Sequence, residues 1–393
     1  MSATASPGAI VRRGGISRIV FIVSLVIVGA GSGLTGYYVG GLAAPQASAV
    51  TLNGAGSTFV YPLISAMNTN YSKTNPKILI NYQAVGSGTG INDLSTKTVD
   101  FGASDAPLSN LQIVSAPNTV TIPDTIGAVV IAYNIPVNST YSLHSGLNLN
   151  VTVAAEIFNG IITVWNDSRI QALNPSLPTG VVLPNKPITI VHRSDSSGTT
   201  FVFSGYLNST SVWGLGQSKT ISWPSSSIGA NGNQGVAAVI QGTKYTVGYV
   251  ELAYALTASP ALSYASLWNP AGQGSFIAPS LTSSLAAASS APSLPAGDNA
   301  AAWQPVNLLN SADPAAYPIV TFSYIMVYKE LNVYGSSMSE SRAQDLVNYL
   351  WFIVHGGQDQ ATPLNYVKLP SNVVQNAEAS LRLITYNGQQ LHA

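Results

Sequence analysis

The sequence predicts an α/β fold divided between two domains, with a segment ahead of them that directs the chain out of the cytoplasm. Three observations carry this prediction. Strand-like and helix-like hydrophobic patterns alternate from residue 50 onward, as expected where helices pack on a sheet. The apolar strand pattern breaks at Asn134-Ile135-Pro136, and a strong one returns after Pro318, which indicates two crossings between domains. A basic and then uncharged apolar stretch opens the chain.

The first 50 residues are predicted to be an export signal or a membrane anchor followed by a spacer. Arg12, Arg13 and Arg18 precede an uncharged run over residues 19–42, and basic residues ahead of an apolar stretch stay on the cytoplasmic side. The run can remain as an anchor, because about 20 apolar residues suffice to span a bilayer. It can equally be removed, because residues 47–49 form a small-residue cleavage site. Both alternatives place the rest of the chain outside the membrane.

Domain I is expected over residues 51–133 and 318–393. The helical pattern is clearest where Leu63, Met67 and Tyr71 share one face. Strands are predicted at residues 50–52, 78–84, 99–103, 119–122, 128–133 and 319–327, and helices at 60–73, 86–94, 339–355 and 371–385.

Domain II is expected over residues 134–317. Strands are predicted at residues 188–192 and 246–251, and helices at 156–165, 169–173, 199–207 and 236–241. Residues 257–316 are rich in Ala, Ser and Pro, a composition typical of long surface loops. We expect one helix there, near residues 280–288.

Composition excludes several classes of function. Three of the 15 basic residues lie in the leader, so 12 basic and 15 acidic residues remain and the rest carries a net charge of −3. No basic face is therefore expected for a nucleic acid. The chain has no cysteine, and its four histidines show no metal-ligand spacing, so we expect no disulfide, metal or cofactor. Five Asn-x-Ser/Thr triplets are compatible with surface glycosylation: Asn70, Asn138, Asn150, Asn166 and Asn208.

Three segments share one design, in which a strand end leads through a small-residue turn into a helix start. They are the first loop (residues 54–59), the second loop (86–90) and the third loop (196–200). At a helix start, backbone N–H groups lack intrahelical partners and the helix dipole presents positive partial charge, which favours an anion. One such loop is more often only a helix cap. Three in one chain predict a site that encloses a small oxyanion.

Three charged residues indicate which kind of oxyanion the predicted site would bind. Arg193 is one of four arginines after the leader and stands at a strand end just before the third loop. Its guanidinium suits an oxyanion, and Asp195 is placed to hold it. Asp105 follows another strand end. A carboxylate only accepts hydrogen bonds, so in an anion site it selects an anion that carries a proton. The alternative for Asp105 is an ordinary turn or cap residue.

Six segments resemble, in order and spacing, the periplasmic phosphate-binding proteins of phosphate ABC importers. They are LNGAGSTF, VGSGTG, VDFGASDAPLS, HRSDSSGTTFVFSGYL, GNQGVAAVIQ and VGYVELAYA. The resemblance covers most of residues 52–254 and is looser over 319–385. It implies a type II periplasmic-binding-protein fold with the ligand between two hinged domains. It also implies a monomer that binds inorganic phosphate outside the membrane and delivers it to ABC importer permease subunits.

The resemblance assigns roles residue by residue. Thr58 and Phe59 correspond to donors of the first loop, Ser87 to the donor of the second loop, and Ser197, Gly198 and Thr199 to donors of the third loop. Asp105 corresponds to the acceptor of the phosphate proton, Arg193 to the charged ligand, and Asp195 to the residue that orients it. Two departures are Gly88, where relatives often have a second Ser, and His192, where a basic residue is common.

Other readings of the same residues remain open. A phosphatase-like enzyme would use Ser197 as its nucleophile, but no base is evident nearby and the chain has no GxSxG or HExxH motif. A surface sensor would bind phosphate without feeding a transporter. A binder of another tetrahedral oxyanion, such as sulfate, is disfavoured by Asp105. We therefore expect a binding protein and not an enzyme.

Overall fold

The computed structural model describes residues 49–177, 181–271 and 274–391. Nearly all of the expected export segment lies outside these residues. Within them, no helix is both long enough and apolar enough to cross a membrane.

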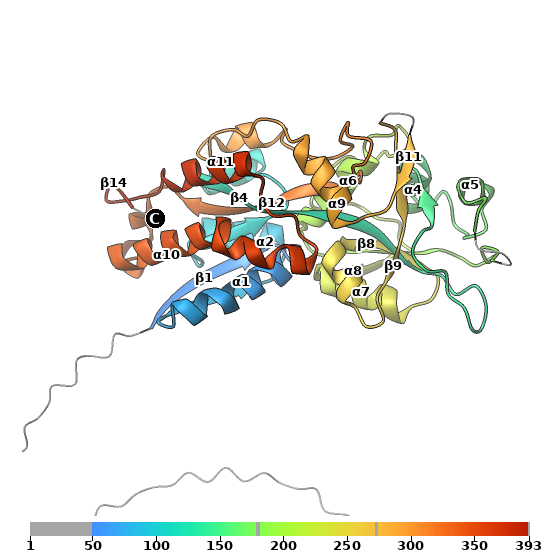
Figure 1. Ribbon diagram of the computed structural model, residues 1–393, viewed down its shortest axis with the longest axis horizontal. Coiled ribbons are helices and arrows are strands. Elements are labelled where there is room, and N and C mark those ends of the chain that lie inside the picture. The colour runs from blue at the N-terminus through green and yellow to red at the C-terminus, as the bar shows by residue number, and fades with distance from the viewer. Residues whose placement is uncertain (1–48, 178–180, 272–273, 392–393) are drawn as a thin grey trace, which may run out of the picture. The chain divides into compact units, whose positions relative to one another are not determined.

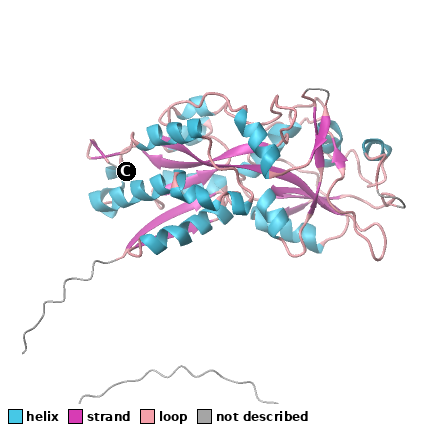
Figure 2. Cartoon of the chain, viewed as in Figure 1, coloured by secondary structure: helices cyan, strands magenta, loops and turns pink. Residues whose placement is uncertain are grey.

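One long, mixed sheet organises the described chain (Figure 2). Its strand order is β2-β1-β3-β12-β4-β8-β6-β7, with β9 beside β4. The strands are β1 (Val50–Gly56), β2 (Ile78–Gln83), β3 (Phe101–Ser104), β4 (Thr119–Asn134), β6 (Thr189–Arg193), β7 (Ile228–Ala230), β8 (Thr246–Glu251), β9 (Ser263–Tyr264) and β12 (Val320–Tyr328).

The 16-residue strand β4 joins two halves of this sheet. Its first part pairs with β12 as far as Ala128, and its last part pairs with β8 from Val129 onward. We call the β2-β1-β3-β12 side the first half and the β8-β6-β7 side the second half. The backbone N–H of Val129 donates to the carbonyl of Ile319 at 2.9 Å, so the two segments that connect the halves lie side by side.

Strand direction brings the carboxyl ends of both halves together. Strands β1, β2 and β3 are parallel to one another, and β3 and β4 are both antiparallel to β12. In the second half, β8 is antiparallel to β4, and β6 and β7 are parallel to β8. Apart from β12, which runs the opposite way, the strands of each half therefore point toward the other half. Loops that follow β1, β2, β3, β6, β7 and β8 meet in the middle, where ligands of open α/β sheets bind.

Helices pack against each half and bury its apolar side chains. Figure 1 shows α1 and α10 beside the first half and α7 and α8 beside the second. In α1, the buried residues Leu63, Ile64, Met67 and Tyr71 form the apolar face expected from the sequence. The helices are α1 (Tyr61–Thr74), α2 (Ser87–Ser95), α3 (Asn110–Ser115), α4 (Val151–Phe158), α5 (Ser168–Leu173), α6 (Gly198–Leu207), α7 (Gly232–Gly242), α8 (Leu252–Thr257), α9 (Leu281–Ser289), α10 (Glu340–Val354) and α11 (Ser371–Leu381).

Short elements complete the structure. A small sheet has the order β11-β10-β5, and β13 pairs with β14 near the carboxyl end. The short elements are β5 (Asn148–Leu149), β10 (Ser266–Asn269), β11 (Ser275–Ile277), β13 (Thr385–Tyr386), β14 (Gln389–Gln390) and the 3-10 helices η1 (Ala300–Trp303), η2 (Leu331–Ser337), η3 (Gly356–Gln360) and η4 (Thr362–Leu364).

Three predictions about elements are wrong. The strands expected at residues 119–122 and 128–133 are one strand, which continues through Pro123 because the pairing with β12 shifts register at that point. The helix expected at residues 156–165 is α4, which begins earlier because the side chain of Asn150 accepts from the backbone N–H of Val153 at 2.8 Å. Residues 257–316 contain β9–β11, α9 and η1 and bury Trp303 in the core, so they are more than surface loop.

Candidate anion-binding site

The structure gathers every residue that the sequence predicted for the site into one buried cluster between the two halves. They come from four stretches of the chain, each of which follows a strand end or begins a helix. The predicted members are Thr58, Phe59, Ser87, Asp105, Arg193, Asp195, Ser197, Gly198 and Thr199; all are buried except Asp195, which is partly buried.

The first loop places hydroxyl groups and backbone amides ahead of α1. The backbone N–H of Phe59 donates to the Ser57 hydroxyl at 2.9 Å. The Thr58 hydroxyl accepts from both the backbone N–H and the side-chain amide of Asn233, each at 3.1 Å. Asn233 lies on α7, so this contact links the two halves. The Tyr254 hydroxyl donates to the Thr58 carbonyl at 2.7 Å from the same side.

Asp105 follows β3 and is the acidic acceptor of the cluster. It is 2% exposed. The hydroxyls of Ser57 and Thr199 donate to its two carboxylate oxygens, Ser57 to Oδ1 and Thr199 to Oδ2, the latter at 3.1 Å. Burial raises the pKa of Asp105 to about 6, although the Ser57 hydrogen bond and the charge of Arg193 favour the ionised form. Near neutral pH, Asp105 is therefore an acceptor held among donors.

Arg193 ends β6 and supplies the positive charge. Its Nε donates to Asp195 Oδ1 at 2.7 Å, its Nη2 donates to Asp195 Oδ2, and its Nη1 lies 3.4 Å from the Thr199 hydroxyl. Burial opposes ionisation of Asp195, but the hydrogen bonds and charge of Arg193 outweigh it, so the pKa of Asp195 lies below its ordinary value. The backbone N–H of Gly232 also donates to Asp195, at 3.1 Å. The two hydrogen bonds to Asp195 fix the orientation of the guanidinium.

The third loop begins α6 and touches the second loop directly. The Ser197 hydroxyl caps α6 by accepting from the Thr200 backbone N–H at 3.1 Å. The backbone N–H of Gly198 donates to the Ser87 hydroxyl at 3.1 Å, and the N–H of Gly88 donates to the Ser196 carbonyl at 2.9 Å. A β-carbon on Gly88 would lie only 2.2 Å from the Ser196 hydroxyl. The third loop therefore leaves no room for a side chain at Gly88, the position where relatives often have a second serine.

Helix starts give the cluster a favourable field for an anion. Helices α1, α2, α6 and α7 all begin in its loops, as the sequence predicted for three of them. Each start presents N–H groups without intrahelical partners and the positive end of a helix dipole. Combined with Arg193, these groups suit a small, multiply oxygenated anion.

Sequence reasoning missed three members of the cluster. Asn233 is fully buried and its amide also donates to the Thr199 hydroxyl at 3.1 Å. Lys219 reaches from the second half to Gln112 Oε1 on α3, at 2.8 Å. The Ser57 hydroxyl donates to the Asp105 carboxylate. The sequence around Asn233 could have indicated its role, because Asn233 opens a helix after a Gly turn, as the predicted loops do. The sequence around Lys219 has no such feature.

Burial shifts the pKa values of titratable groups around the cluster. Burial lowers the pKa of Lys219 to about 8, and the charge of Asp105 partly restores it. Burial raises the pKa of Asp124 to about 8 and that of Glu251 well above its ordinary range. The charge of Asp105 adds to both of these increases, so the three carboxyl groups disfavour simultaneous ionisation.

Ser197 and His192 have structural roles in this region. The Ser197 hydroxyl is occupied in capping α6, and His192 Nδ1 lies 3.0 Å from the Arg193 carbonyl while its ring stacks on Trp223. His192 is thus a packed strand residue. Across the described ranges, no group of three or more His, Asp, Glu or Cys side chains is arranged to hold a metal ion.

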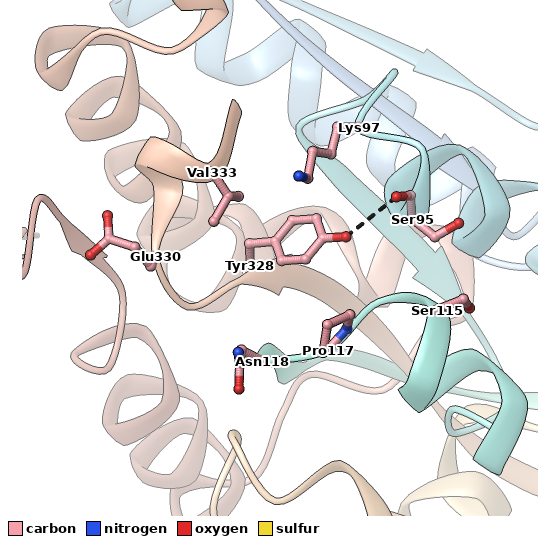
Figure 3. A pocket seen from close by; sticks show the side chains of 8 residues that line it. All are labelled: Ser95, Lys97, Ser115, Pro117, Asn118, Tyr328, Glu330 and Val333. Carbon is pink, nitrogen blue, oxygen red and sulfur yellow. Dashed lines mark hydrogen bonds between the residues drawn. The ribbon is translucent and has the colours of Figure 1, made fainter. Parts of the chain in front are cut away.

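A separate surface cavity of about 240 Å³ lies at the opposite end of the first half (Figure 3). Its lining includes Lys97, Tyr328 and Glu330. The register of β12 against β3 runs from Tyr324 beside Ser104 to Met326 beside Gly102, so Tyr328 lies toward the end of β3 away from Asp105. The cavity contains no member of the cluster.

Comparison with known proteins agrees with the geometry. A family model described as the PBP superfamily domain matches residues 42–357. The chain is 38% identical over 340 residues to "Phosphate-binding protein PstS" of Xylella fastidiosa, covering 86% of each chain. It is 40% identical over 340 residues to the protein of that name from Haemophilus influenzae, covering 85% of this chain and 93% of the relative.

Solved structures show the same fold at lower identity. A high affinity periplasmic phosphate-binding protein, PfluDING, bound with phosphate, aligns with a TM-score of 0.65 at 20% identity, covering 84% of this chain and 93% of its own. A human phosphate binding apolipoprotein aligns with a TM-score of 0.66 at 18% identity, covering 86% and 99%.

Proposed function

The chain belongs to the PBP superfamily and, within it, to the family of the PstS phosphate-binding proteins, and from this premise we propose that it binds inorganic phosphate outside the cell membrane and delivers it to an ABC-type importer. One observation carries the proposal: the buried carboxylate of Asp105 lies among the donors of Ser57, Thr199 and Arg193. Donors alone would suit any oxyanion. A donor-rich site with one acceptor suits an anion that keeps a proton.

Each predicted residue has a role in this proposal. Arg193 neutralises the anion while Asp195 holds it in place. Asp105 accepts the proton of the phosphate. The remaining donors are the hydroxyls and backbone amides of Thr58, Phe59, Ser87, Ser197, Gly198 and Thr199. In the structure several of these groups bond one another across the two halves, so phosphate would replace hydrogen bonds that already connect them.

Domain organisation follows from the same reasoning. The two halves correspond to domain I and domain II, with the ligand between them and a hinge at the adjacent segments that contain Val129 and Ile319. The protein acts as a monomer and presents the closed, loaded form to the permease subunits. A sensor or a phosphatase-like enzyme is not favoured, because the relatives are named for phosphate binding and the Ser197 hydroxyl is occupied in capping α6.

Calorimetric titration of the purified protein with phosphate, arsenate and sulfate tests the function. Phosphate and arsenate should bind, and sulfate should bind roughly 10⁴-fold more weakly, because a site built around a required hydrogen bond rejects an analogue that lacks it. Asp105→Asn should raise sulfate affinity relative to phosphate, since an amide N–H₂ can face an acceptor oxygen. Absence of phosphate binding would refute the function. An unchanged phosphate-to-sulfate ratio in the variant would move discrimination away from Asp105.

A further inference from the structure

Ser57 occupies a position in the cluster that none of the predicted roles explains. Its hydroxyl is fully buried, accepts from the Phe59 backbone N–H at 2.9 Å and donates to Asp105 Oδ1. A serine hydroxyl has a single hydrogen. Because the Phe59 N–H approaches from the acceptor side, that hydrogen is directed at the carboxylate.

This contact makes the two oxygens of Asp105 unequal. Oδ1 is taken by Ser57, whereas Oδ2 faces the Thr199 hydroxyl at 3.1 Å, beside Arg193 and Asn233. Thr199 is itself a proposed phosphate donor and also has one hydrogen. When that hydrogen turns to the ligand, Ser57 is the hydroxyl that still donates to Asp105.

We propose that Ser57 is a specificity-determining positioning residue, which keeps Asp105 ionised and leaves Oδ2 as an obligatory acceptor that excludes anions without a proton. The proposal rests on the phosphate-binding function proposed above. Ser57 acts through Asp105 and does not itself need to touch the anion.

The charges around Asp105 show why such a residue is needed. Arg193 and Lys219 favour the ionised carboxylate, but burial opposes it and raises its pKa to about 6. Two further buried carboxyls, Asp124 on β4 and Glu251 at the end of β8, are electrostatically coupled to Asp105 and would repel it when ionised. Among the groups that favour ionisation, the Ser57 hydrogen bond has the largest effect. Without it, Asp105 would hold a proton to higher pH and could donate to sulfate.

Sulfate affinity measured against pH is the test, because sulfate remains a dianion while Asp105 titrates. In the wild type, sulfate binding should appear only as the pH falls through about 6. Ser57→Ala should move this midpoint upward by about one pH unit, because a hydrogen bond to a charged group is worth about 1.5 kcal/mol or more. Between the two midpoints the variant should bind sulfate up to about tenfold more tightly than the wild type.

Matched variants separate this effect from damage to the fold. Ser204→Ala removes another fully buried serine hydroxyl, which bonds backbone groups of residues 201 and 218 and should leave the midpoint unchanged. Ser57→Cys keeps the shape with a weaker donor and should move the midpoint in the same direction as Ser57→Ala, so it serves if the alanine variant does not fold. In an Asp105→Asn background, Ser57→Ala should change the pH profile no further.

The outcomes distinguish the two proposals. A wild type that binds phosphate and rejects sulfate, with an unmoved midpoint in both Ser57 variants, overturns the role of Ser57 alone. An equal shift in the Asp105→Asn background also overturns it, because Ser57 would then act elsewhere. A wild type that binds no phosphate refutes the function and this inference with it.

Discussion

Arg193 divides its guanidinium between Asp195, which receives two hydrogen bonds, and the interior of the cluster, where Nη1 approaches Thr199. Arg193→Ala should therefore remove the main positive charge that faces the anion. It should also leave Asp195 without its ion-pair partner. We expect phosphate binding to weaken by about 2–5 kcal/mol or more, measured by calorimetry.

Arg193→Lys is the informative control. A lysine keeps the charge but cannot reproduce the paired contact with Asp195, so its affinity should lie between wild type and the alanine variant. Retention of phosphate affinity within about threefold in Arg193→Ala, roughly 0.6 kcal/mol, would exclude Arg193 from the site.

Residues whose roles depend on local sequence could be predicted, and those that depend on distant partners could not. Arg193 and Asp195 are two residues apart at a strand end, so their pairing is visible in the sequence. Ser57 meets Asp105 across 48 residues, and Asn233 meets Thr58 across 175. In the sequence, Ser57 is only one of several small residues in the first loop. Its contact with Asp105 follows from the pairing of β1 with β3, which the sequence does not show.

At the scale of elements, the start of α6 packs tightly against the first half. An added β-carbon on Gly198 would lie 2.6 Å from the Ser87 hydroxyl, 2.7 Å from the Asp105 backbone nitrogen and 2.8 Å from Asp105 Oδ2. Gly198→Ala should hold the halves apart and weaken phosphate binding by at least about tenfold, or roughly 1.4 kcal/mol, without lowering the melting temperature.

A second helix offers the matched substitution. A β-carbon on Gly235 of α7 would meet Ala230 at ordinary contact distances of 3.5–4.0 Å. Gly235→Ala should bind phosphate normally and unfold at an equal or higher temperature, since alanine favours a helix interior by about 1 kcal/mol over glycine. Equal phosphate affinity in the two alanine variants would contradict a tight closure at Gly198.

The pairing of β4 with β12 skips Asp124 and leaves a carboxyl group in the core. The register places Pro123 opposite Tyr324 and Thr125 opposite Ser323, and Asp124 is 1% exposed. Its carboxylate oxygens have no hydrogen-bond donor in good geometry among the described residues. Burial raises the pKa of Asp124 from 3.8 to about 8, and the Ser323 hydroxyl offsets only part of this.

Asp124 should therefore destabilise the fold as the pH rises. The native state holds a proton that the unfolded chain has released, so stability declines between about pH 4 and about pH 8. Asp124→Asn should flatten this decline and raise the unfolding free energy at alkaline pH by several kcal/mol, because each pKa unit corresponds to about 1.4 kcal/mol. Urea unfolding at several pH values measures this change. Asp359→Asn, at a side chain that is 74% exposed, should leave the profile nearly unchanged. A wild-type decline that persists in Asp124→Asn would contradict this assignment.

Elements with a strong hydrophobic period were predictable, and those fixed by pairing or by tertiary burial were not. The apolar face of α1 and the uninterrupted series of buried residues in β12 are patterns of the local sequence. The continuity of β4 depends on its register with a strand about 200 residues away. The burial of Trp303 within an Ala- and Ser-rich segment is a property of packing and has no periodic signature.

At the scale of the whole binding unit, the structure shows the two halves in contact through polar groups at the cluster. Gly88 meets Ser196, and Lys219 meets Gln112. The connecting segments at Val129 and Ile319 are the elements around which such contacts can open. A ligand can shift this equilibrium only by binding one state more tightly than the other. Phosphate binds the closed state more tightly if the groups that donate hydrogen bonds to it come from both halves, as proposed.

Small-angle scattering should consequently report a smaller radius of gyration when phosphate is added to the free protein, because phosphate draws donors of both halves around one anion. Sulfate at the same concentration should leave the radius unchanged at neutral pH, where Asp105 is ionised and rejects it. Gly198→Ala should fail to contract even with enough phosphate to occupy its weakened site, since its added β-carbon occupies the space between Ser87 and Asp105. If the wild-type radius does not change with phosphate, the halves do not move apart in the free protein, and the anion must then enter through local motion of the second and third loops. Contraction of the wild type and of Gly198→Ala to the same extent would place the closing contact elsewhere in the interface.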